Sequence, residues 1–245
     1  MSPLTAASPH AARAAARWID SYLLPLVAAE HITSPGRALR CLHIEPDDEL
    51  EAIHLRRLGN DCDVLLSPLN RRHPAPRWER PPIVADMARL PLTDRRYDLI
   101  WSAAFGRLNP GPECRRASAC ELLRICAPGG GVLLMQGNVA SPLYMRRGLR
   151  LALGPLGPLG PLGPHRATLA GLQQAFIGDA GFAVMRSHSL AGHFGWGSVP
   201  RGMRGVTWVL ERYLRWASHP GRPARYASAL NPMFALWFGR APVPR

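Results

Sequence analysis

The sequence predicts a doubly wound α/β fold, in which a mainly parallel, seven-stranded sheet carries helices on both faces. Two observations lead to this prediction. Short apolar runs of strand length alternate along the chain with segments of helical periodicity, which is typical of stacked right-handed β-α-β units. Several of these runs, such as DLIW and VLLM, are apolar without alternation, as expected for strands buried on both faces of a parallel sheet.

The first predicted element is a helix. Residues 8–30 are amphipathic and rich in Ala and Arg, which favours a helix that packs on the outside of the core, kinked or ended at Pro25. Residues 34–36, Ser-Pro-Gly, then break the pattern. We therefore expect an N-terminal helical extension over residues 1–36 and a Rossmann-like domain over residues 37–245.

The strands and helices of this domain follow from the same patterns. Each predicted strand is a short apolar run between breaking residues, and each predicted helix has apolar residues at helical spacing. In chain order we expect strand 38–44, helix 47–59, strands 62–67, 83–86 and 95–104, helix 113–126, strand 132–137, helix 168–180, strand 182–187, helix 203–217 and strand 231–239. The glycines at 129–131 are expected to stop one helix sharply before the next strand.

One low-complexity segment interrupts this order. Residues 154–164 contain three tandem GPL units, in which the recurring proline excludes both a helix and a central strand. We expect an extended spacer there, inserted into the domain. The preceding segment, residues 142–153, has the pattern of a short basic amphipathic helix, which indicates either a lid packed on the sheet or contact with a membrane surface.

The composition excludes several classes of protein. The chain has 245 residues and is 47% hydrophobic and 19% charged, which excludes disorder throughout and indicates one sizeable core. No window has the roughly 18 apolar residues of a membrane span, and no signal-peptide pattern is visible, so we expect a cytoplasmic protein. The 5 cysteines form no C-x-x-C pair, which argues against a disulfide framework and a structural zinc site, and no metal is expected.

The net positive charge of the chain is only weak evidence for nucleic acid or an anionic surface as a partner. A formal net charge of +13 ordinarily indicates nucleic acid or an anionic surface as a partner. However, all 30 residues of the Lys+Arg count are arginine, and Ala, Gly and Pro are abundant, which indicates biased coding as much as selection for phosphate contacts. The arginine pairs are also spread along the chain, so nucleic-acid binding is disfavoured.

Three segments point to a more specific function. They are IVADMARLPLTDRRYDLIWS at 83–102, ELLRICAPGGGVLLM at 121–135 and LAGLQQAFIGDAGFAVMRS at 169–187. Together they resemble the small, single-domain branch of the class I S-adenosylmethionine-dependent methyltransferases. The resemblance implies a Rossmann-like fold, S-adenosyl-L-methionine as the cofactor, and methyl transfer to a small-molecule acceptor.

The resemblance implies a cofactor site at the carboxyl edge of the sheet, where open α/β folds bind ligands. Asp86 matches the acid that accepts a hydrogen bond from the adenine amino group, helped by the backbone N–H of Met87; the alternative is that Asp86 caps a turn. Ser102 is expected to face the sulfonium and the acceptor, through its backbone rather than its hydroxyl. Asp98 matches a position that is mostly structural in the family, and it is left out of the site.

The first strand departs from the family pattern. Where relatives have an acidic residue and then glycines, LHIEPDDEL places His43 at the acid and Glu45, Asp47 and Glu49 at the glycines. A variant branch with an LH-x-x-P-E turn is similar to this form, so His43, Glu45 and Asp47 are candidates for cofactor binding. The acidic loop is expected to attract the cationic amino group and sulfonium of the cofactor and to repel its carboxylate.

The second strand departs from the pattern as well. Relatives hold both ribose hydroxyls with an acid at its end, whereas CDVLLSPLN places Leu65 or Leu66 there, so Leu66 becomes a cofactor contact without an acceptor. Losing a charged partner for a sugar hydroxyl costs roughly 1.5–3 kcal/mol, or about ten- to a hundredfold in affinity. Many relatives have a histidine where this chain reads AAFGRLN, and no general base replaces it. No catalytic residue is therefore assigned.

Two functions remain open at this point. One is methyl transfer, in which alignment of the acceptor and exclusion of water supply much of the rate enhancement. The other is a catalytically inactive relative that keeps the fold and serves as a binding or interaction module. The C-terminal histidines and aromatic residues could line an acceptor pocket, although core packing explains the aromatic residues equally well. These residues are His165, His188, His193, Phe194, Trp196, Trp208, Tyr213 and Trp216.

Overall fold

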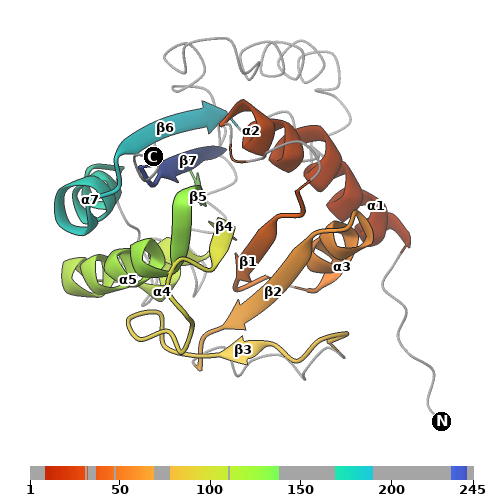
Figure 1. Ribbon diagram of the computed structural model, residues 1–245, viewed down its shortest axis with the longest axis horizontal. Coiled ribbons are helices and arrows are strands. Elements are labelled where there is room, and N and C mark those ends of the chain that lie inside the picture. Colours follow the sequence, from red (N-terminus) through yellow and green to blue (C-terminus); the bar gives the residue numbers. More distant parts are fainter. Residues whose placement is uncertain are drawn as a thin grey trace, which may run out of the picture.

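The chain folds around one seven-stranded sheet (Figure 1). The computed structural model describes residues 9–30, 32, 37–46, 48–68, 78–109, 111–137, 169–189 and 233–241. The strands are β1 (Arg40–Ile44), β2 (Asp61–Leu66), β3 (Ile83–Val84), β4 (Tyr97–Ser102), β5 (Cys126–Gly137), β6 (Val184–Ser189) and β7 (Met233–Gly239). The helices are α1 (Pro9–Trp18), the π-helix η1 (Ile19–Leu23), α2 (Leu24–Ala29), α3 (Leu50–Arg57), α4 (Phe105–Leu108), α5 (Pro112–Ile125), α7 (Leu169–Gln173) and the π-helix η3 (Gln174–Ala180).

The strand order is β3-β2-β1-β4-β5-β7-β6, which confirms the predicted seven-stranded sheet. Each neighbouring pair from β3 to β5 is parallel, and only β7 runs antiparallel to its two neighbours. The chain builds the sheet from β1 towards β3 on one side and from β4 onwards on the other. Ligands of open α/β sheets bind beyond the carboxyl ends of the strands at such a switch point. The topology thus directs attention to the ends of β1 and β4.

The sheet has an apolar core on each face, which confirms the prediction of helices on both sides (Figure 1). Under α5 and η3, Phe176 stacks on Phe238 with ring centroids 4.2 Å apart and meets Phe105 edge-on at 5.2 Å. The second core lies under α1 to α3 and contains Trp101 and Trp237 from the sheet. Every residue of β4 is buried, which explains why this strand is apolar without alternation.

The N-terminal helices belong to the second core rather than merely covering it. Ile19 and Leu23 are fully buried in this cluster. Pro25 does not end the helix, because it lies in the first turn of α2, where a missing N–H costs little. At the end of α2, Arg186 of β6 donates to the carboxylate of Glu30 at 2.9 Å, which joins the helix to the edge strand.

Two local predictions differ from the structure in their details. β5 already begins at Cys126, so the residues expected to separate helix and strand are themselves part of the strand. The short helix α4 was not predicted.

Asp98 has the structural role expected of it, since it accepts hydrogen bonds from the Arg37 side chain at 2.7 Å and from the Arg40 backbone at 2.9 Å.

Several predictions fall outside the described residues. They are the GPL segment 154–164, the segment 142–153, the helix 203–217, the cofactor candidate Asp47, and the residues His165, His193, Phe194, Trp196, Trp208, Tyr213 and Trp216. Among the helices that the structure does describe, none has both the length and the apolar character needed to cross a membrane.

Candidate functional site

The turn after β1 keeps a left-handed backbone without using a glycine. Glu45 has a φ of 54°, a region that glycine adopts readily and other residues rarely adopt. Its N–H donates to the carbonyl of Leu65 at 2.8 Å, which extends the pairing of β1 with β2. The backbone at the first expected glycine position therefore has the conformation that glycine would provide.

The Glu45 side chain crosses from the end of β1 to the end of β2. The residue is only 5% exposed, and its Oε1 accepts the backbone N–H of Ser67, the residue after Leu66. A buried carboxylate requires such hydrogen bonds, because desolvation of its charge is costly. Glu45 thus places a carboxylate beside the strand end at which the sequence itself has leucines.

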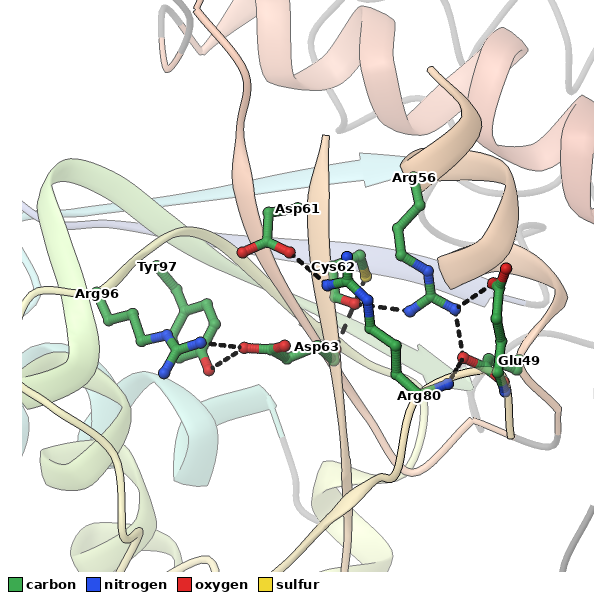
Figure 2. Close-up of polar contacts among 9 residues, drawn as sticks. Glu49, Arg56, Asp61, Cys62, Asp63, Arg80, Arg96 and Tyr97 are labelled. Atoms are coloured by element: carbon green, nitrogen blue, oxygen red, sulfur yellow. Dashed lines mark hydrogen bonds and ion pairs between the residues drawn. The ribbon is translucent and has the colours of Figure 1, made fainter. Parts of the chain in front are cut away.

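Glu49, at the third expected glycine position, forms a buried ion pair with Arg56 of α3 (Figure 2). The Arg56 and Glu49 side chains are 10% and 6% exposed. The Glu49 carboxylate also accepts the backbone N–H of Glu79, and Arg56 donates to the carbonyl of Cys62 at 2.9 Å. This pair joins the turn after β1, the helix α3, β2 and the segment before β3.

Two further acids of β2 are engaged by arginines of the neighbouring loops (Figure 2). Asp61 pairs with Arg80 at 2.7 Å. Asp63 accepts hydrogen bonds from Arg96 at 2.7 Å and from the Tyr97 hydroxyl at 2.8 Å. Burial, together with the hydrogen bond to Asp63, raises the pKa of the Tyr97 phenol, so the hydroxyl stays protonated and acts as a donor. These acids link β2 to the segments that precede β3 and β4.

His43 packs on the opposite face of β1 from the Leu42 and Ile44 side chains. Its buried ring stacks on Trp101 with centroids 4.3 Å apart, and its Nδ1 lies 3.4 Å from Oε2 of Glu51. The Trp101 indole donates to the same oxygen at 3.3 Å. Burial lowers the pKa of His43 to about 3, so the ring is neutral near pH 7. Helix α3 therefore brings a carboxylate next to the strand position where relatives have an acid.

The buried His43 is expected to make the protein less stable as the pH falls. The unfolded chain binds a proton at the ordinary histidine pKa of 6.5, whereas the folded chain does not until about pH 3. Unfolding therefore takes up a proton between these values, and the free energy of unfolding falls with decreasing pH by at most about 1.4 kcal/mol per pH unit. Urea unfolding of His43→Phe between pH 6.5 and 5 is expected to show a flatter dependence than wild type.

The matched control for this prediction is His54, which is partly exposed and lies 2.9 Å from Asp20. The slope of His54→Gln shows how far removal of a histidine outside the two cores changes the dependence. An unchanged slope in His43→Phe would show that another group causes the acid sensitivity.

Ser102 joins the ends of β1 and β4 at the switch point. Its fully buried hydroxyl donates to the carbonyl of Ile44 at 3.2 Å and accepts the N–H of Ala104 at 3.0 Å. The side chain thus holds two strand ends together. Its predicted place beside the sulfonium and the acceptor stays a prediction.

Asp86, Met87 and Leu66 lie at the ends of β3 and β2. Asp86 is exposed, and its Oδ1 accepts the N–H of Ala88 at 2.9 Å, which is the turn-capping alternative. A carboxylate can accept about four hydrogen bonds, so this cap is compatible with binding an adenine amino group as well. The Met87 side chain is buried in the first core and that of Leu66 packs against the second, so the ligand contacts predicted for them fall mainly to their backbones.

Sequence reasoning missed the pair formed by Glu49 and Arg56 and the role of Glu51. The first had a usable signal, because residues seven apart lie on the same face of a helix, and α3 begins directly after Glu49. The sequence contains no such signal for Glu51, because its partners His43 and Trp101 come from two different strands.

Comparison with known proteins identifies the fold. No protein-family model and no curated protein matches the sequence. Among solved structures, a SAM-dependent methyltransferase from Archaeoglobus fulgidus superposes with a TM-score of 0.52 at 12% identity, over 89% of this chain and 93% of that one. A proposed sarcosine dimethylglycine methyltransferase from Galdieria sulphuraria gives 0.50 at 14% identity, over 91% and 85%.

A third structure, phosphoethanolamine N-methyltransferase 2 of Haemonchus contortus in complex with S-adenosyl-L-methionine, gives a TM-score of 0.50 at 12% identity. The superposition includes 94% of this chain and 56% of that one. At such identities the likeness concerns the fold. This chain therefore has the fold of the class I S-adenosylmethionine-dependent methyltransferases.

Proposed function

We propose that this protein is an S-adenosylmethionine-dependent methyltransferase that acts on a small-molecule acceptor. The observation that carries the proposal is the left-handed turn at Glu45, directly beside the switch point of the sheet. A residue with a Cβ in this conformation is strained by about 1–3 kcal/mol, and such residues cluster at ligand sites, which supports a function for the Glu45 side chain. The methyltransferase names of the structural neighbours support the same function.

The residues at this edge fit an adenosyl cofactor in their chemistry. Asp86 offers an exposed carboxylate beyond β3 for the adenine amino group, and Glu45 offers a second one between the ends of β1 and β2. Carboxylates also attract the cationic amino group and sulfonium. When bound, the cofactor supplies a methyl group that its positive sulfur has already activated. The role of the protein is then to orient the acceptor and to exclude water.

A small-molecule acceptor agrees better with the charges of the described part of the chain than nucleic acid does. Several of its arginines are paired with carboxylates, including Arg56, Arg80, Arg96, Arg124 and Arg186. A guanidinium that is already paired has less to gain from a phosphate. The net positive charge therefore does not by itself indicate a nucleic-acid surface.

Calorimetric titration with S-adenosylhomocysteine tests the proposed function directly. We expect saturable heat of binding to the folded protein at micromolar to submillimolar ligand. Absence of heat at millimolar ligand, with a sample that unfolds cooperatively, would favour the alternative function of a non-catalytic binding module. That alternative is supported by the leucines at the end of β2, which cannot accept a hydrogen bond from ribose.

Replacing Asp86 by alanine is expected to weaken binding of S-adenosylhomocysteine about tenfold, because the adenine amino group loses a charged acceptor. The melting temperature should change little, since Asp86 is exposed and contributes one turn hydrogen bond. Calorimetry and thermal unfolding of the same sample measure both quantities.

Asp94→Ala is the matched control for this variant. Asp94 is an exposed carboxylate that pairs with Arg124 at 2.6 Å, and its loss should leave affinity unchanged. If Asp86→Ala lowers stability in proportion to affinity, Asp86 acts as a structural cap.

A further inference from the structure

We propose that Glu45 takes over ribose binding from the end of β2, by accepting hydrogen bonds from the ribose hydroxyls of the cofactor. This inference rests on the proposed function. It names the residue that supplies a hydrogen-bond acceptor for the ribose, which the second strand lacks. It assigns the role to a residue of the neighbouring strand, at a position where the family resemblance leads one to expect glycine.

The end of β2 has no acceptor side chain of its own. Leu65 is buried in the core on one face of the sheet, and Leu66 packs against the core on the other. Neither side chain can accept a hydrogen bond. A ribose at this edge therefore needs its acceptor from another element, because a buried hydroxyl without a partner is costly.

Glu45 is placed where such an acceptor is needed. Ile44 of β1 lies beside Leu65 of β2 in the parallel register, so Glu45 follows the end of β1 at the level of Leu66, the last residue of β2. Neighbouring strands are about 4.8 Å apart, a distance that a glutamate side chain can span. The Glu45 carboxylate does span it, since Oε1 accepts the N–H of Ser67 at the end of β2. The proposed acceptor for the ribose hydroxyls therefore comes from the turn after β1 and not from the end of β2.

The backbone of Glu45 indicates that the side chain is what this position requires. A φ of 54° costs a residue with a Cβ about 1 kcal/mol or more, whereas glycine adopts it at little cost. Glycine would therefore be the more stable choice for the turn alone. A carboxylate can accept about four hydrogen bonds, so anchoring to Ser67 and binding a hydroxyl are compatible.

The other carboxylates described on the same strands have different tasks. Asp61 pairs with Arg80, and Asp63 is bonded to both Arg96 and Tyr97. Both lie towards the beginning of β2, away from its carboxyl end. Of the acids described on β1, β2 and the turn between β1 and α3, Glu45 is the one that reaches the residue after β2.

The test measures how far the ribose hydroxyls and Glu45 depend on each other. Calorimetry compares S-adenosylhomocysteine with its 2′,3′-dideoxy analogue on wild type and on Glu45→Gly, the residue that the backbone favours. Wild type is expected to bind the dideoxy analogue about tenfold or more weakly. Glu45→Gly is expected to bind S-adenosylhomocysteine about tenfold more weakly than wild type does, and to bind the two ligands within about twofold of each other.

A second variant protects the test against a folding defect. Glu45→Gln keeps an oxygen that can accept the Ser67 N–H, and it is expected to fold and to discriminate less than wild type, because a charged acceptor bonds about twice as strongly as a neutral one. Glu49→Gln is the matched control in the same turn. It should discriminate as wild type does, whatever its effect on stability.

The outcomes separate this inference from the proposed function. If wild type binds neither ligand, both are wrong. If wild type binds S-adenosylhomocysteine and the Glu45 variants still discriminate between the ligands as wild type does, only the ribose assignment is wrong, and Glu45 serves the fold through Ser67.

Discussion

Arg56→Ala is expected to lower the free energy of unfolding by about 3–5 kcal/mol, as is typical when one partner of a buried ion pair is removed. The Glu49 carboxylate, 6% exposed, would lose its cationic partner while staying buried. The variant would also lose the hydrogen bond that Arg56 donates to the carbonyl of Cys62. A loss of this size is a large part of the stability of an ordinary domain. Urea unfolding followed by circular dichroism measures it.

Glu79→Ala is the matched control for this prediction. Glu79 binds the same guanidinium at 3.1 Å, but its side chain is 61% exposed, so its removal should cost less than about 1 kcal/mol. The paired replacement Glu49→Leu with Arg56→Met removes both charges and is expected to recover part of the stability that Arg56→Ala loses, because no unpaired charge stays buried, although the Glu79 N–H and the Cys62 carbonyl lose these partners. If Arg56→Ala costs no more than Glu79→Ala, the pair does not hold the turn in place.

Gly131→Ala is expected to cost about 3 kcal/mol, because the new Cβ would overlap the indole of Trp237. Gly131 of β5 and Gly239 of β7 are register partners, and the Trp237 ring lies against both. The ring cannot move aside freely, since Trp237 is buried in the second core. The loss appears in urea unfolding and as a lower melting temperature.

The partner glycine provides the control for this substitution. A Cβ at Gly239 would lie 3.3 Å from Nε1 of Trp237, a tight contact that small shifts relieve, so Gly239→Ala should cost less than about 1 kcal/mol. In a Trp237→Leu background, Gly131→Ala should cost much less than in wild type. Equal costs in the two backgrounds would show that the ring is not what excludes the side chain.

The fold was predictable where burial acts on a whole element. The middles of β4 and β5 are buried on both faces, so their residues are apolar without alternation, and together with the alternation of strands and helices this predicts a mainly parallel sheet. The helix α4 was not predictable in this way, because four residues are too few to show a period. The π-helix η1 was equally hidden, since its five residues are too few to show a period of their own.

The site was predictable only as far as strand ends could be placed. Asp86 and Ser102 follow from the positions at which β3 and β4 end. The partners of these acids did not follow, because Glu45 bonds to Ser67 beyond β2, and Glu51 of α3 lies against side chains from two strands. Such contacts join elements that are separate in the sequence, and no local pattern reports them.

β7 lies between β5 and β6 in the sheet, although it follows both of them in the chain (Figure 1). While a ribosome makes residues 138–232, β5 therefore has one unpaired edge, and both cores lack the aromatic residues of β7. At about 5–20 residues per second this interval lasts on the order of ten seconds. An open strand edge is a template for pairing with other chains. Nascent copies of this protein are thus expected to depend on chaperones until β7 is synthesised.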